Sequence, residues 1–130
     1  MAYKINQHNS FEKGFKKIDA QHQPTVIAEI DELVKDPNKG ETTKGALHKL
    51  GFKKLKITST NPEYRVLYRV VKCEKPPVKD NKFICASGIA HSNLAEYNGC
   101  NGVIDFALCG TREMFNNLYK LPMDKVKKYL

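Results

Sequence analysis

The sequence of 130 residues lacks the features that would place it in several large classes of protein. It has no run of about 18 apolar residues, which argues against a membrane-spanning helix. Its opening residues, MAYKINQHNS, lack the apolar segment of a secretory signal peptide. We therefore expect a single cytoplasmic domain, residues 1–130, that has no membrane partner.

The cysteines form no recognisable metal-binding motif. There are four of them, at positions 73, 85, 100 and 109, and no two are spaced as CxxC. Nothing else in the sequence indicates the oxidising compartment in which disulfides persist. We interpret the four as reduced, partly buried thiols, and the sequence predicts no metal site and no cofactor.

Acidic residues are scarce in the middle of the chain. Residues 44–75 contain nine Lys or Arg and two Glu, so this segment carries +7 of the formal net charge of +8. A concentrated positive field of this kind attracts polyanions. The alternative is a solvated strand whose lysines protect a sheet edge from aggregation. Arginines inside an otherwise apolar strand favour the polyanion interpretation.

Hydrophobic periodicity predicts an order of elements. Strands are expected at 3–6, 53–58, 64–71 and 103–110, where apolar residues alternate or run together. Two helices are expected between the first and second strands, the first beginning at a capping box of Asn9 and Glu12, the second at Pro24. Residues 40–52 are interpreted as a loop. Thr111 is expected to cap a last helix that Pro122 ends, and a basic tail follows.

The two middle strands, in LKITSTNPEYRVLYRVV, carry cations on one predicted face. The two-residue side-chain period places Lys54 and Lys56 together on the first strand. The same period places Arg65 and Arg69 together on the second. We expect these four side chains to meet on one surface of the ribbon. Tyr64, Tyr68 and Phe115 are interpreted as core residues, with base stacking as the alternative.

Three short motifs resemble the RelE/ParE superfamily of small bacterial toxins. They are LKITS followed by EYRVLYRV, then FALCGTRE, then NLYK. The resemblance covers residues 1–71 and 103–121, and residues 76–102 are an insertion relative to compact members. It implies an α+β fold, with two N-terminal helices packed on a small, mostly antiparallel twisted sheet and a C-terminal helix.

The resemblance also implies a function. Many RelE-like toxins are ribosome-dependent endoribonucleases that cut mRNA through the substrate's own 2′-hydroxyl, so mRNA, the ribosome and an antitoxin protein are the expected partners. Carried onto this sequence, the family's catalytic positions and the neighbouring RNA-binding cations fall on two sets of residues. The catalytic set is Lys54, Lys56, Arg65, Arg112 and Tyr119, and the RNA-binding set is Lys49, Lys53 and Arg69.

These residue types suit RNA cleavage without a metal. Rigidly placed Lys and Arg side chains stabilise the charge that develops on a phosphorane-like transition state. A proton must also leave the 2′-hydroxyl and another must reach the leaving oxygen. A lysine whose pKa is lowered by neighbouring cations, or Tyr119, serves that purpose, and His48 is the nearest histidine in the sequence.

Three other functions stay open at this stage. ParE-like members share the fold but inhibit DNA gyrase, and a silent relative would only grip a protein partner. A basic nucleic-acid-binding module without chemistry is the third possibility. The basic strand together with Arg65 and Arg112 favours the nuclease.

Overall fold

A five-stranded sheet is the frame of the molecule. The computed structural model describes residues 2–72, 75, 77–85 and 90–128. The strand order is β1–β7–β4–β3–β2, and β1 runs parallel to β7 while the other neighbours are antiparallel. The bounds of the strands are Ala2–Gln7 for β1, Glu41–Thr42 for β2, Lys53–Ile57 for β3, Tyr64–Lys72 for β4 and Cys100–Thr111 for β7.

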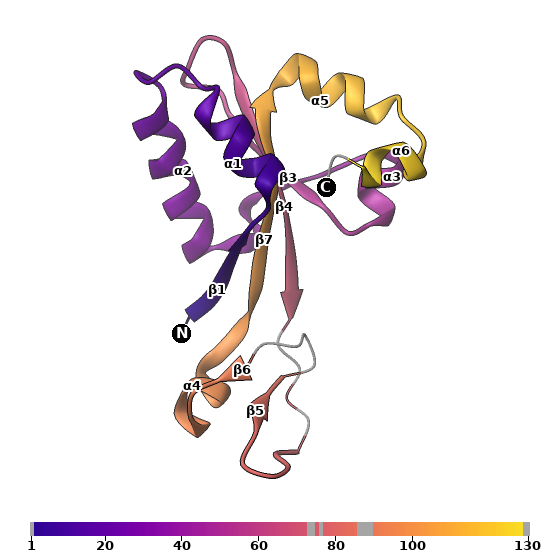
Figure 1. Ribbon diagram of the computed structural model, residues 1–130. Coiled ribbons are helices and arrows are strands. Elements are labelled where there is room, and N and C mark those ends of the chain that lie inside the picture. The colour runs from indigo at the N-terminus through magenta and orange to yellow at the C-terminus, as the bar shows by residue number, and fades with distance from the viewer. Residues whose placement is uncertain (1, 73–74, 76, 86–89, 129–130) are drawn as a thin grey trace.

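Helices cover both faces of this sheet (Figure 1). On one face lie α1 (Asn9–Lys16) and α2 (Gln23–Lys35). On the other face lie α3 (Gly45–Lys49), α5 (Arg112–Tyr119) and α6 (Met123–Lys127). Each face has its own hydrophobic cluster, and the central strands contribute to both. A strand that is covered on both sides is expected to be apolar throughout, and this explains the uninterrupted burial of residues 104–109 in β7.

The fold differs from the sequence-based prediction chiefly in its extra elements. The first strand, the two N-terminal helices and the late strand are confirmed, but the sheet is larger than predicted, because the short β2 adds a fifth strand. The segment that was interpreted as a loop contains β2 and α3 instead. Helix α3 was missed because a helix of one turn is too short to display a periodic apolar face.

Helix ends agree with the prediction at two of three positions. Pro24 lies in the first turn of α2, as expected. The Thr111 side chain accepts a hydrogen bond from the Met114 amide and caps α5. The capping box is wrong: His8 is the N-cap of α1, and no side chain caps this end. The basic tail forms α6, so the C-terminal part of the chain has two short helices rather than one.

A buried tyrosine fixes the chain where it enters β2. Tyr68 is fully buried, and its hydroxyl donates to the Pro37 carbonyl at 2.8 Å and accepts from the Gly40 amide at 3.0 Å. Residues Pro37–Lys39 form a single 3-10 turn, η1, after α2. Satisfying a buried hydroxyl in this way holds the turn rigidly. Tyr68 thereby sets the position of Glu41, which starts β2. Tyr64 and Phe115 are buried too, as the sequence predicted.

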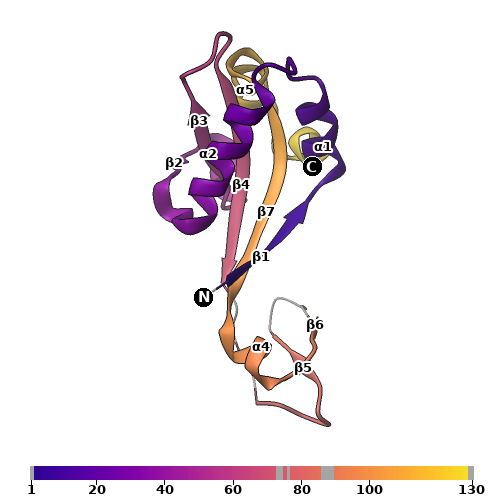
Figure 2. The same cartoon turned by 90° about the vertical axis from the view of Figure 1, so that its left-hand side faces the viewer.

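A small lobe extends beyond one end of the long β4 and β7 strands (Figures 1 and 2). This distal lobe consists of β5 (Phe83–Ile84), β6 (Ala90–His91) and α4 (Leu94–Gly99). It lies within the segment 76–102 that the sequence analysis interpreted as an insertion, although β7 already begins at Cys100. Cys73, and parts of that segment, lie outside the described residues. No helix in the described part of the chain is both long enough and apolar enough to cross a bilayer.

Candidate functional site

Strand register brings three cations together on the sheet face that α5 covers. Lys56 lies directly opposite Arg65, and Lys54 lies opposite Leu67, two residues further along β4. Side chains two residues apart on a strand share a face, so Lys54, Lys56 and Arg65 lie on one surface. We call these three residues the basic cluster. Three of the four cations that were predicted to share this surface therefore form one group.

Two members of the basic cluster are buried without forming an ion pair. Lys54 is 8 % exposed and Arg65 is 6 % exposed. Within the described part of the chain, neither side chain forms an ion pair, and Arg65 Nε has no hydrogen-bond partner. Burying an unpaired charge is costly, and like charges opposite one another on neighbouring strands repel. The arrangement opposes folding, which is typical of a site built to bind an anion.

Tyr119, from the last turn of α5, covers Lys54. The Lys54 Nζ atom lies 5.4 Å from the centre of the Tyr119 ring, within the range of a cation–π contact. The Tyr119 hydroxyl is buried and has no hydrogen-bond partner among the residues described. Burial raises the pKa of this phenol, against the opposing effect of Arg65. Tyr119 therefore keeps its proton at neutral pH and has a hydrogen bond left to donate.

Lys54 is shifted toward the neutral form. Burial is the main cause of its lowered pKa, and repulsion by Lys56 and Arg65 adds to the effect. A lysine with a lowered pKa is a better proton acceptor near neutrality than an exposed lysine is. A lysine with a lowered pKa and a phenol with a raised pKa thus lie next to each other, with the Lys54 Nζ atom over the Tyr119 ring.

Glu41 is a member of the site that the sequence analysis missed. Its Oε2 atom accepts from Lys56 Nζ at 2.9 Å across the β2–β3 edge. The hydrogen bond from Lys56 is the first cause of the lowered pKa of Glu41. Both side chains are substantially exposed, so salt screens the pair. Glu41 therefore forms an ion pair with Lys56 that a competing anion, such as a phosphate, can displace. The sequence did not indicate Glu41 as a site residue, because Glu41 lies in the segment that was interpreted as a loop.

Arg69 differs from Arg65 although both lie on the same strand face. Its Nη2 atom lies 3.2 Å from Asp105 Oδ2 on β7, and its guanidinium lies 5.0 Å from the centre of the Phe52 ring. Asn6 donates to the other oxygen of Asp105 at 2.9 Å. Arg69 is therefore engaged by a neighbouring acid, in contrast to the buried arginine of the basic cluster.

The remaining predicted residues lie on the opposite face of the sheet or in the helices α3 and α5. Lys53 alternates with Lys54 and so lies on the opposite face of the sheet. Lys49 is exposed at the end of α3, and His48 is exposed beside it. Arg112 is the exposed first residue of α5, and its backbone amide donates to the Glu63 carbonyl at 3.4 Å. The side chain of Arg112 contacts no acid among the described residues.

Comparison with known proteins bears directly on this site. A family model described as the ParE-like toxin of type II bacterial toxin–antitoxin systems matches residues 5–78, which is more than half of the chain and includes the whole basic cluster. The chain belongs to this family of toxins. Membership implies an antitoxin as a partner of this toxin.

A solved structure supports the fold of the toxin. A double arginine-to-alanine mutant of the E. coli toxin RelE in the free state is similar to this chain, with a TM-score of 0.57 and 15 % sequence identity. The alignment covers 97 % of this toxin and 99 % of the RelE chain. The resemblance to the RelE/ParE superfamily that the sequence suggested is therefore confirmed. Among curated protein sequences, none matches the toxin.

Proposed function

We propose that the toxin is an endoribonuclease that cleaves mRNA, and that it does so on the ribosome in the cytoplasm. The observation that carries the proposal is the burial of Lys54 and Arg65 without an ion pair, beside the unpartnered hydroxyl of Tyr119. The presence of buried cations that destabilise the free protein is explained if a bound phosphate of the RNA supplies the missing negative charge. The concentration of net positive charge in residues 44–75 supports an RNA ligand.

The proposed reaction uses no cofactor and no metal. Lys54, in its neutral form, takes the proton from the 2′-hydroxyl of the RNA, and the 2′-oxygen attacks the adjacent phosphorus. The bond from phosphorus to the 5′-oxygen breaks, and that oxygen receives a proton from Tyr119. The products are a 2′,3′-cyclic phosphate and a 5′-hydroxyl. The Tyr119 hydroxyl is covered in this structure, so the mechanism requires RNA binding to uncover it.

The other cations of the site bind the phosphate. Arg65 presents a planar fork of donors that fits two phosphate oxygens. Lys56 releases Glu41 and binds the same phosphate as Arg65 while negative charge grows in the transition state. Arg112, Lys49 and Lys53, which are outside the cluster, hold the RNA backbone further away. Arg69 serves mainly to fix β4 to β7 through Asp105.

Inhibition of DNA gyrase is the competing function, because the matching family is described as ParE-like. A gyrase inhibitor has no need for a lysine with a lowered pKa beside a buried, unpartnered phenol, so the packing of Lys54 against Tyr119 favours the nuclease. A direct test is controlled expression of the toxin in bacteria. We expect translation to stop and message to be cut within minutes, without induction of the DNA-damage response.

The matched variants in that experiment are Arg65→Met and Lys127→Met. Arg65→Met should abolish the arrest of translation, and Lys127→Met, which changes an exposed lysine on α6, should not. If the DNA-damage response is induced and message stays intact, the toxin is a gyrase inhibitor and the nuclease proposal is wrong. The antitoxin is expected to cover the basic cluster with an acidic segment, so added salt should weaken the complex.

A further inference from the structure

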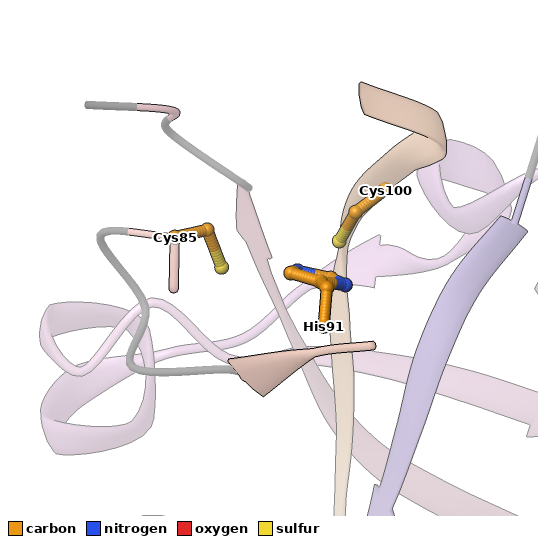
Figure 3. A group of neighbouring side chains, drawn as sticks. All are labelled: Cys85, His91 and Cys100. Atoms are coloured by element: carbon orange, nitrogen blue, oxygen red, sulfur yellow. The ribbon is translucent and has the colours of Figure 1, made fainter. Parts of the chain in front are cut away.

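Three metal-binding side chains meet in the distal lobe, far from the basic cluster in the fold. Cys85 follows β5, His91 lies in β6, and Cys100 is the first residue of β7. One ligand atom from each, the two Sγ atoms and a ring nitrogen, lie within 4.8 Å of one another. The two cysteine side chains approach the imidazole of His91 from either side (Figure 3). All three residues are buried.

His91 has unmet hydrogen-bonding capacity. The residue is 7 % exposed, and neither Nδ1 nor Nε2 has a hydrogen-bond partner among the residues that the structure describes. Buried polar groups in proteins are almost always satisfied, so such an imidazole requires an explanation. A bond from one ring nitrogen to a metal ion would supply the missing partner, since imidazole and thiolate are common ligands of the same ion.

The donor set and its spacing fit zinc. Two cysteine sulfurs and one histidine nitrogen bind zinc in preference to magnesium or calcium, because those two ions take oxygen ligands. Zn–S bonds of about 2.3 Å in a tetrahedral site place the two sulfurs about 3.8 Å apart. The observed limit of 4.8 Å is therefore within a short side-chain adjustment of that geometry. We propose that Cys85, His91 and Cys100 bind a zinc ion that fixes the distal lobe to the start of β7.

The surroundings of the three side chains suit a structural site. The Tyr97 ring packs edge-on against His91, with ring centres 5.7 Å apart, and Phe83 packs against Tyr97 at 6.3 Å. Asn93 caps α4 by accepting from the Glu96 amide, and the Glu96 carboxylate accepts in turn from the Ser92 amide. This cap fixes the chain between the second and third ligands, and the aromatic rings hold the His91 imidazole in place.

The lobe also needs a crosslink. Neither hydrophobic cluster of the sheet includes a described residue of the lobe. Ile84 and Leu94, which belong to the lobe, are about half exposed, at 45 % and 51 %. A unit this small rarely has enough core of its own, and small domains without one are often held by metals. Three protein ligands leave one tetrahedral position for water or for a further ligand.

Metal analysis of the purified full-length toxin is the first test. Protein that was produced in zinc-containing medium and purified without chelators should contain one zinc per chain. Cys85→Ser, His91→Gln and Cys100→Ser should each lose that zinc. Two matched controls, Cys109→Ala on β7 and His48→Gln on α3, should retain it, because both residues lie outside the group. Zinc-free wild-type protein with reduced thiols would overturn the proposal.

Two measurements on the wild-type toxin guard against variants that fail to fold. Cobalt(II) that replaces zinc should give the visible bands of a tetrahedral ion and a near-ultraviolet band from thiolate. Removal of zinc by a chelator should speed amide hydrogen exchange in β5 and β6 by about tenfold or more and leave β3 and β4 unchanged. A disulfide between Cys85 and Cys100 in protein prepared under reducing conditions would exclude the zinc site, and so would octahedral, sulfur-free cobalt spectra.

Discussion

Lys54, the proposed proton acceptor, should also destabilise the folded toxin. It is buried beside Lys56 and Arg65, whose repulsion exceeds the attraction by Glu41, and it forms no ion pair among the described residues. Like charges on neighbouring strands cost about 0.2–1 kcal/mol for each pair. Lys54→Met removes the repulsion by Lys56 and Arg65 and keeps an unbranched apolar stem. We therefore expect the free energy of unfolding to rise by about 1 kcal/mol, and the melting temperature by about 3 °C.

The same substitution should abolish activity. Loss of a general base slows a reaction by about 10²–10⁴-fold, so cleavage of message in a translating extract should fall by at least about 10²-fold. The assay pairs thermal unfolding with single-turnover cleavage, and Lys127→Met is the control that should change neither. A Lys54→Met protein that is less stable and still cleaves message would refute the reasoning, because Lys54 would then be a structural residue.

The pH dependence of stability gives an independent check on Lys54. Its pKa in the folded state is below the ordinary value of 10.5, so the folded protein binds fewer protons than the unfolded chain does in the range below that value. The free energy of unfolding contributed by Lys54 therefore increases with pH there. Tyr68 and Tyr119, whose pKa values burial raises, act in the opposite direction above pH 10. They cancel when wild type and Lys54→Met are compared, and the difference between the two proteins should shrink as the pH rises.

Three further predictions concern the residues around Lys54. Tyr119→Phe removes a buried, unpartnered hydroxyl, so the free energy of unfolding, measured in urea, should stay unchanged or rise by up to about 1 kcal/mol. Cleavage of message should fall about 10²-fold. Undiminished cleavage would exclude Tyr119 as the proton donor. Glu41→Gln releases Lys56, so RNA should bind more tightly and with a steeper salt dependence in filter binding; weaker binding would show that Glu41 organises the site. Arg69→Met leaves the Asp105 carboxylate unpaired and should lower the unfolding free energy by about 1–3 kcal/mol with little change in RNA affinity; the opposite pattern would make Arg69 an RNA ligand.

The alternation of side chains along a single strand predicted which residues share a face of the sheet. The period of two in β3 and β4 correctly placed Lys54, Lys56 and Arg65 on one face, because that face is covered and its side chains must alternate. The same pattern did not distinguish Arg65 from Arg69. That distinction depends on β7, which places Asp105 opposite Arg69 and Gly110 opposite Arg65.

Contacts between distant segments account for most of what the sequence did not show. Glu41 lies beside Lys56 because β2 pairs with β3 after the turn that Tyr68 holds. Cys85, His91 and Cys100 come together through two short strands and a single helix, so their spacing in the chain matches no familiar metal motif. Sequence reasoning that reads only regular spacing misses a site whose ligands are separated by irregular turns.

Cleavage of RNA through the 2′-hydroxyl at the basic cluster would leave a chemical signature at the cut ends. Purified toxin would be added to a reconstituted translation system with a defined message, and the new ends would be mapped and identified. We expect 5′-hydroxyl and 2′,3′-cyclic phosphate ends, no cutting of a message with a 2′-deoxy residue at the cleavage position, and no cutting by Lys54→Met. Intact message, or cutting that leaves 5′-phosphate ends and tolerates the 2′-deoxy residue, would contradict the proposed mechanism.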